Sequence, residues 1–238
     1  MKSKEYVETT KKMFSKWKNK PAENGVNHKD SVFVSDGIVN PDIWYKNNVR
    51  LLFLLKEAYG GTEDWDLAKD LLKTNKSLGP TWKRVSQWTY GILNTSIKSI
   101  PGFKKSSEFS KGNNEWLNKI AVMNCKKSNG KSTSTSDDIK NYTCTDQKEL
   151  LEQLKVIDPT VIVCGYTYEN LEIIIGQKLK KIYGNNENWF YSFMINNHTV
   201  IVLDYYHPAN DYPDLLNFYG LVGIYQQALK SKDDSRDM

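Results

Sequence analysis

Four short apolar runs constrain the fold of this chain more than any other feature. The runs are VRLLFLL at 49–55, IAVM at 120–123, TVIVCG at 160–165 and HTVIVLDYYHP at 198–208. Their apolar residues are continuous rather than alternating, and each run stops at polar residues, a glycine or a His-Pro pair. That pattern is typical of strands buried on both faces. The four runs therefore predict a central parallel sheet of about four strands.

Segments with helical spacing of apolar residues lie around these runs. The segments 4–19, 82–98 and 146–157 show this spacing, which predicts amphipathic helices. Further helices are expected at 65–73, from about residue 168, and over 213–230. Strands that alternate with helices predict an α/β protein, here a three-layer αβα sandwich with helices on both faces of the sheet.

The chain of 238 residues is long enough for one large domain. No internal repeat and no break in composition marks a boundary within it. We therefore predict a single domain over 1–238, with 1–48 as an N-terminal helix and loop extension. Residues 126–143 are rich in lysine, serine, threonine and asparagine, and we expect a mobile surface loop there.

The net charge of +5 comes almost entirely from lysine, since Arg50, Arg84 and Arg236 are the only arginines. This composition disfavours the reading of guanine by bidentate arginine and leaves open loose contacts from lysine to phosphate. A lysine-rich, solubilising surface explains the charge equally well. The charge alone therefore does not decide between a nucleic-acid partner and none.

The three cysteines, Cys125, Cys144 and Cys164, form no CxxC pair. No apolar segment reaches the roughly 18 residues that a membrane span requires, and the N-terminal residues do not have the pattern of a signal peptide. We therefore expect reduced thiols, a cytoplasmic location and no membrane partner. Zinc signatures, phosphate-binding glycine loops and nucleophile elbows do not occur, so neither a metal nor a cofactor is predicted.

Polar residues follow each apolar run, and parallel strands bring such residues together at the carboxyl edge of the sheet, where ligands bind. A glutamate there can orient a water or accept a proton, an asparagine can read the polar edge of a base, and a histidine can stabilise developing negative charge. The segments in question are 56–61 (KEAYGG), 124–127 (NCKK), 165–166 (GY) and 207–210 (HPAN).

These segments resemble, in order, the motifs of the uracil-DNA glycosylase superfamily. KEAYGGTED is similar to the first motif, especially to the Gly-Glu-Ala-Pro-Gly form of the family 4 branch, and NCKK resembles the strand-end asparagine and nearby lysine of that branch. CTDQKELLEQLKVIDPTVIVCG resembles the Cys-helix-Lys-Pro-strand-Gly segment, and YHPAN resembles the closing His-Pro-Ser motif. The resemblance covers about residues 49–225 and implies a glycosylase-like fold.

The resemblance also implies a reaction, the hydrolysis of the N-glycosidic bond of uracil or a related deaminated base in single- or double-stranded DNA. Such enzymes flip the base out of the helix, because the bond cannot be reached inside the stack. Glu57 would position the attacking water, Asn124 would read the Watson–Crick edge of the base, and His207 would donate a hydrogen bond to the departing base. Trp82 in the GPTW segment is a candidate for stacking on that base.

The sequence departs from the family pattern at several positions. Lys56 stands where a glycine is expected, and could crowd the pocket or contact a phosphate. Tyr59, beside Gly60, replaces a proline and could exclude the methyl group of thymine. Only Cys144 lies near the position of a cluster cysteine, so an iron–sulfur cluster cannot form and no cofactor is expected. The closing motif has Ala209 in place of serine.

Other interpretations remain open at this point. Glu57 could cap a following helix, Asn124 could form a turn, and Trp82 could belong to the core. The alternative function is a catalytically inactive protein that binds nucleic acid or a nucleotide, and an enzyme acting on a free nucleoside is a third. Binding to DNA requires a positive groove, for which the expected contributors are Lys56, Lys126, Lys127 and Lys131.

Overall fold

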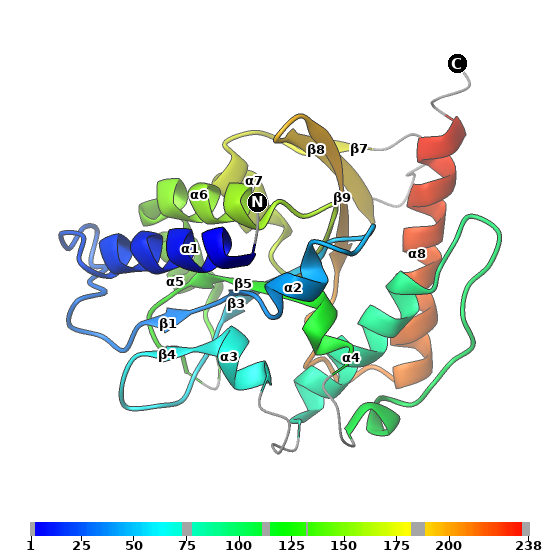
Figure 1. The fold of residues 1–238 in the computed structure, drawn as a ribbon, viewed down its shortest axis with the longest axis horizontal. Coiled ribbons are helices and arrows are strands. Elements are labelled where there is room, and N and C mark those ends of the chain that lie inside the picture. Colours follow the sequence, from blue (N-terminus) through cyan, green and yellow to red (C-terminus); the bar gives the residue numbers. More distant parts are fainter. Residues whose placement is uncertain (1–2, 73–77, 111–114, 132, 182–188, 235–238) are drawn as a thin grey trace.

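The computed structural model describes residues 3–72, 78–110, 115–131, 133–181 and 189–234. Within these residues the protein is α/β, and seven strands form one mixed, mostly parallel sheet (Figure 1). In spatial order the strands are β2 (Gly37–Ile38), β5 (Ile120–Lys126), β3 (Leu51–Glu57), β6 (Val161–Gly165), β9 (His198–Tyr205), β8 (Phe190–Ile195) and β7 (Lys180–Lys181).

The four central strands, β5, β3, β6 and β9, are parallel and correspond to the four apolar runs, which confirms that prediction. Every residue of β5 and β6 is buried, as expected for strands covered on both faces. The antiparallel strand β8 was not predicted. It pairs with β9 through a hairpin whose two turn residues, Asn196 and Asn197, both have positive φ, as primed hairpin turns require.

Helices cover both faces of the sheet. One face carries α1 (Ser3–Lys18), α5 (Ser136–Thr145), α6 (Gln147–Ile157) and α7 (Tyr168–Ile175), and Figure 1 shows α1 and α6 side by side there. The other face carries α3 (Leu67–Leu72), α4 (Pro80–Leu93) and α8 (Asp214–Asp234). Strand β3 supplies both cores, because Leu52 and Leu54 point to one face and Leu51 and Phe53 to the other.

The remaining elements are short. Strand β1 (Val34–Ser35) pairs in parallel with β4 (Trp65–Asp66), and helix α2 (Pro41–Trp44) precedes β3. Two 3-10 helices, Ser106–Ser110 and Leu117–Lys119, lie between α4 and β5.

The expected surface loop at 126–143 is wrong in its second half, which forms most of α5. This helix places Asp137 and Asp138 in its first turn, where negative charge is favourable, and buries Ile139 and Thr143 against the core. The sequence did not predict this helix because its composition is polar and only two of its residues are buried. Residue 73, the expected end of another helix, lies outside the described residues.

The N-terminal 48 residues are part of the main fold. Helix α1 buries Tyr6 and Trp17 against the core, and β2 extends the sheet beside β5. The phenol of Tyr6 accepts a hydrogen bond of 2.8 Å from the backbone N–H of Ile38 and so ties the helix to that strand.

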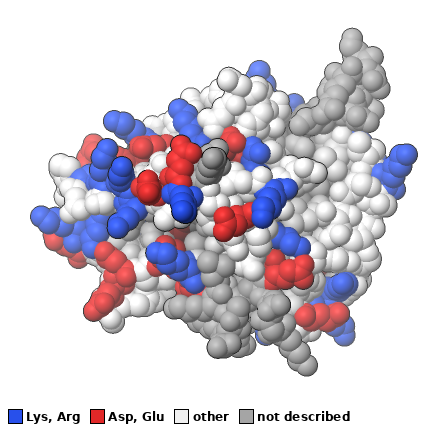
Figure 2. Space-filling model, viewed as in Figure 1, with Lys and Arg blue, Asp and Glu red and all other residues white. Residues whose placement is uncertain are grey.

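The surface carries charges of both signs. Figure 2 shows lysine and arginine side chains interspersed with aspartate and glutamate over the face that carries α1, without a large area of one sign. Within the described part of the chain, no helix is both long enough and apolar enough to cross a membrane.

Candidate functional site

A cavity of about 670 Å³ opens at the carboxyl edge of the parallel strands. The chain runs from β3 outward to β5 and then back across β3 to β6, so the strand order reverses beside β3, and ligands bind at such points in α/β sheets. Seven of the residues predicted for the site line this one cavity. These residues are Lys56, Glu57, Tyr59, Gly60, Trp82, Asn124 and His207.

His207 follows β9 by two residues and is held as a hydrogen-bond donor. Its Nδ1 accepts a hydrogen bond of 3.2 Å from the backbone N–H of Ala209, so in the neutral ring the proton lies on Nε2. Burial, with a smaller contribution from the charge of Lys56, lowers the pKa of His207 to about 4. The imidazole is therefore neutral at pH 7 and presents an Nε2–H to a ligand.

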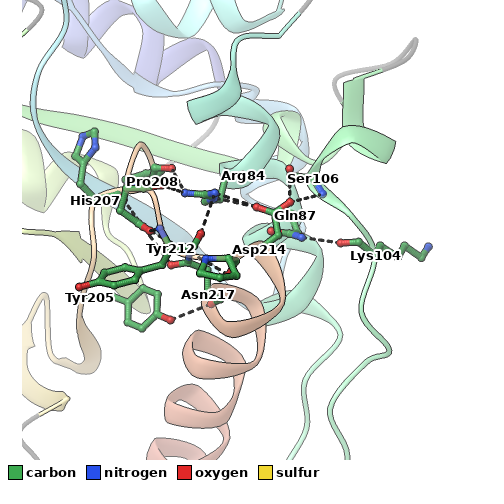
Figure 3. Close-up of polar contacts among 12 residues, drawn as sticks. Arg84, Gln87, Lys104, Ser106, Tyr205, His207, Pro208, Tyr212, Asp214 and Asn217 are labelled. Carbon is green, nitrogen blue, oxygen red and sulfur yellow. Dashed lines mark hydrogen bonds and ion pairs between the residues drawn. The ribbon is translucent and has the colours of Figure 1, made fainter.

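Arg84 on α4 clamps the loop that carries His207 (Figure 3). Its guanidinium donates to the carbonyl oxygens of Pro208, at 3.1 Å, and Asn210, and to the carboxylate of Asp214, at 2.9 Å. Figure 3 shows the imidazole of His207 directed away from this cluster. Arg84 thus has a structural role, because it holds the loop in place. The ring of His207 is not part of this cluster and lines the cavity.

The far end of the same loop is fixed to α8. Asp214 accepts a hydrogen bond of 2.5 Å from the hydroxyl of Ser106, and the side chains of Asn210 and Asn217 exchange hydrogen bonds of 3.0 and 3.1 Å. Asn210 also donates to the backbone carbonyl of His207 at 2.7 Å. Asn210 therefore braces the loop that carries His207.

Asn124 is held from behind by Asp36, a residue that sequence reasoning missed. The backbone N–H and the side-chain Nδ2 of Asn124 donate to Oδ2 of Asp36 at 2.8 and 3.0 Å. The other carboxylate oxygen accepts from Lys127 at 2.5 Å and from Gln153 at 2.7 Å. Because Nδ2 points inward, the amide presents its Oδ1, for which no partner occurs among the described residues, to the cavity. The interpretation of Asn124 as a turn former is wrong.

Two of the lysines expected to contact phosphate have other partners. Lys127 is completely buried, with its ammonium paired to Asp36, so the prediction of a phosphate contact is wrong for this residue. Lys126 has a side chain only 10% exposed and pairs with Glu57 at 3.1 Å and Asp138 at 2.7 Å. Its charge is offset by two carboxylates and it does not line the cavity, so the same prediction fails there.

Lys56 and Lys131 do line the cavity. Of the four lysines expected to form a positive groove, these two line the cavity, and the groove itself stays a prediction. Lys126 and Lys127 instead have structural roles. They pair with the largely buried carboxylates of Glu57 and Asp36, which require a positive partner.

Glu57 forms part of the cavity wall with its carboxylate largely covered. Its side chain is 4% exposed, one carboxylate oxygen pairs with Lys126, and the other accepts a hydrogen bond of 3.4 Å from the backbone N–H of Lys131. Gly130 crosses directly above, since a Cβ at that position would overlap the Glu57 carboxylate. The nearest following helix is α3, which begins at Leu67, so the helix-cap interpretation of Glu57 is wrong.

The aromatic residues of the site differ in exposure. Tyr59 is 65% exposed and precedes Gly60, whose φ of 111° is a conformation that only glycine adopts readily. Trp82 lies in the first turn of α4, half-buried against the core and in contact with the cavity. Trp82 therefore packs partly against the core and also lines the cavity, and its stacking on a base stays a prediction.

Comparison with family models and with curated proteins gives no match for this chain. The site is therefore interpreted from its own geometry. Among the residues that the structure describes, no group of three or more His, Cys, Asp or Glu side chains is arranged to hold a metal ion.

Proposed function

We propose that this protein is a DNA-base glycosylase-like hydrolase on a uracil-DNA glycosylase-like, three-layer αβα scaffold. The observation that carries the proposal is that Glu57 of β3, Asn124 of β5 and His207, which follows β9, line one cavity. The cavity volume of about 670 Å³ suits a small ligand such as a nucleobase.

The chemistry assigned to the site matches the edge of a uracil-type base. The N3–H of the base donates to Oδ1 of Asn124, and a base carbonyl oxygen accepts from Nε2–H of His207. When the glycosidic bond breaks, its electron pair stays with the base, and His207 stabilises the negative charge on that oxygen. A water adds to the sugar carbon beside Glu57 and loses its proton to solvent or to the carboxylate.

The test is the single-turnover release of base from uracil-containing single- and double-stranded oligonucleotides. The His207→Ala variant is expected to lose roughly 10²- to 10³-fold in rate, the usual effect of removing one such donor. His198→Ala is the matched control, because His198 bonds to the carbonyl of Pro159 at the other end of β9. Failure of the wild type to release base from either substrate contradicts the proposal.

A second function is favoured by one specific observation, the pairing of the Glu57 carboxylate with Lys126 in a largely covered position. A carboxylate held this way offers little surface to an attacking water, because its side chain is only 4% exposed and one oxygen is paired with Lys126. The corresponding proposal is a catalytically inactive protein that binds nucleic acid or a nucleotide in the same cavity. Binding of the oligonucleotides without release, unchanged in Glu57→Gln, is the result expected for this function.

A further inference from the structure

A row of three tyrosines continues the carboxyl edge of the sheet beyond the cavity. Tyr166 is the first residue after β6, Tyr206 is the first after β9, and Tyr212 lies in the loop that follows. The ring centroids of Tyr166 and Tyr206 are 5.7 Å apart, and those of Tyr206 and Tyr212 are 4.8 Å apart. Tyr166 and Tyr212 are 51% and 52% exposed, so this tyrosine row is a continuous aromatic surface open to solvent.

The backbone of Tyr166 adopts a conformation that packing does not explain. Its φ of 57° lies in the left-handed region, which is a genuine outlier for a bulky side chain. Two carbonyl oxygens, those of Cys164 and Tyr205, accept from its backbone N–H at 3.1 and 3.0 Å and hold this geometry. Because the ring is half exposed, burial does not compensate for the strain, and such residues cluster at functional sites.

A positive charge lies at the end of the row that faces the cavity. The ammonium of Lys56 is 5.8 Å from the centroid of the Tyr166 ring, and Lys56 also lines the cavity. The negative charge of Asp204 also acts on Tyr166 and disfavours a phosphate close to that carboxylate. Exposed aromatic faces beside a lysine are the combination by which proteins bind single-stranded nucleic acid, through base stacking and phosphate contact.

We propose that the tyrosine row stacks on unpaired bases flanking the nucleotide in the cavity, so that the protein prefers single-stranded to double-stranded nucleic acid. This inference rests on the proposed function, since it takes a nucleobase as the occupant of the cavity. The rings are inclined to one another by 76° and 51°, so Tyr166 and Tyr212 each receive one base rather than forming a flat stack. Paired bases hide their faces, and a duplex cannot make these contacts.

The test is fluorescence anisotropy with a labelled single-stranded DNA that contains thymine and no uracil, beside the same sequence as a duplex. Such DNA reports binding without base release. The wild type is expected to bind the single strand more tightly. Tyr166→Ala and Tyr212→Ala are each expected to weaken single-strand binding by roughly 5- to 150-fold, the effect of losing one base–aromatic stack. Duplex binding is expected to change little.

Matched variants separate stacking from a loss of folding. Tyr166→Phe and Tyr212→Phe keep the ring and are expected to retain the affinity. Tyr219→Ala removes an exposed tyrosine of α8 that packs against Phe103 and Phe218 outside the row, and it is expected to leave single-strand binding unchanged. Thermal melting of each variant establishes that it is folded.

The outcomes distinguish this inference from the proposed function. Three results overturn the inference that the tyrosine row binds single strands, even if uracil is released. They are equal affinity for the two forms of DNA, no binding to either form, and full affinity in the Tyr166→Ala/Tyr212→Ala double variant. If the wild type releases no uracil but binds single strands in a way that depends on the tyrosines, the role of the tyrosine row is supported and the proposed glycosylase activity is contradicted.

Discussion

At the scale of single residues, the site depends on one buried carboxylate. Asp36 is fully buried and binds Asn124, Lys127 and Gln153 at once. A buried ion pair contributes little net stability, but removing one partner leaves an uncompensated charge in the interior. Asp36 therefore fixes the orientation of the Asn124 amide, and Lys127 allows Asp36 to be buried as a carboxylate.

Asp36→Asn is expected to destabilise the fold by about 3–5 kcal/mol, because the ammonium of Lys127 loses its partner. The double variant Asp36→Asn/Lys127→Met removes both charges and is expected to recover part of that loss. Urea denaturation measures both free energies of unfolding. A double variant less stable than Asp36→Asn would show that Lys127 does not depend on Asp36.

The pKa of His207 gives a prediction that can be tested without any substrate. An NMR titration of the ring protons is expected to give a midpoint near pH 4 for His207. Because the folded pKa lies below the ordinary value of about 6.5, the folded state binds fewer protons in between. The contribution of this residue to stability is therefore constant above about pH 6.5 and decreases as the pH falls toward 4.

Lys56→Met is the matched variant for this titration. Removing the nearby positive charge is expected to raise the pKa of His207, by less than the lowering due to burial. A midpoint in the wild type at the ordinary value would mean that the ring is solvated, and would contradict the burial to which the low pKa is attributed.

At the scale of elements, α4 and α8 are the helices that support the loop of His207, and their packing requires a glycine. A Cβ at Gly91 on α4 would meet side-chain atoms of Val222 at 2.6 Å and Phe218 at 2.8 Å on α8. Gly223 on α8 has no neighbour within 4 Å of a Cβ. The two positions are both glycines in helices, and they differ in the space available.

Gly91→Ala is expected to destabilise the protein by about 1–2 kcal/mol, since overpacking exceeds the gain in helix propensity. Gly223→Ala is expected to stabilise it by about 0.5–1 kcal/mol, because there the propensity acts alone. Midpoints of chemical denaturation measure both. A stabilised Gly91→Ala variant would indicate that α8 moves away from α4 without cost.

Sequence patterns predicted the four central strands and the helices α1, α3, α4, α6, α7 and α8, and they missed elements with a weak apolar pattern or a dependence on a partner strand. The four buried strands were predicted because continuous apolar runs are a local signal. Helix α5 and strand β8 were missed, since α5 buries few residues and β8 becomes a strand through its pairing with β9. Three predicted site residues, Glu57, Asn124 and His207, meet at one cavity because each follows or ends a predicted strand.

At the scale of the whole molecule, charges of both signs are interspersed on the face shown in Figure 2, so that face carries no large area of one sign. Of the described lysines expected to contact nucleic acid, Lys56 and Lys131 line the cavity. Affinity for single strands is therefore expected to depend more on stacking than on phosphate neutralisation.

This balance predicts a shallow dependence of single-strand affinity on salt. Two lysine–phosphate contacts correspond to a slope of about −1.4 for the logarithm of the association constant against the logarithm of salt concentration. Anisotropy titrations at several salt concentrations measure the slope, and Lys131→Ala is expected to reduce its magnitude by about 0.7. A slope steeper than about −4 would require a larger basic surface than these two lysines provide.

The sequence by itself determined the class of fold and the edge of the sheet at which polar residues gather, because runs of apolar residues and the residues that end them are local properties of the chain. Only the tertiary structure decided which lysines line the cavity and which are paired with buried carboxylates. Asp36 reaches Asn124 across 88 positions and Lys127 across 91, and these contacts turn an expected phosphate ligand into a buried counter-charge. The tyrosine row likewise exists only because β6 and β9 are neighbours, since no local pattern relates Tyr166 to Tyr206.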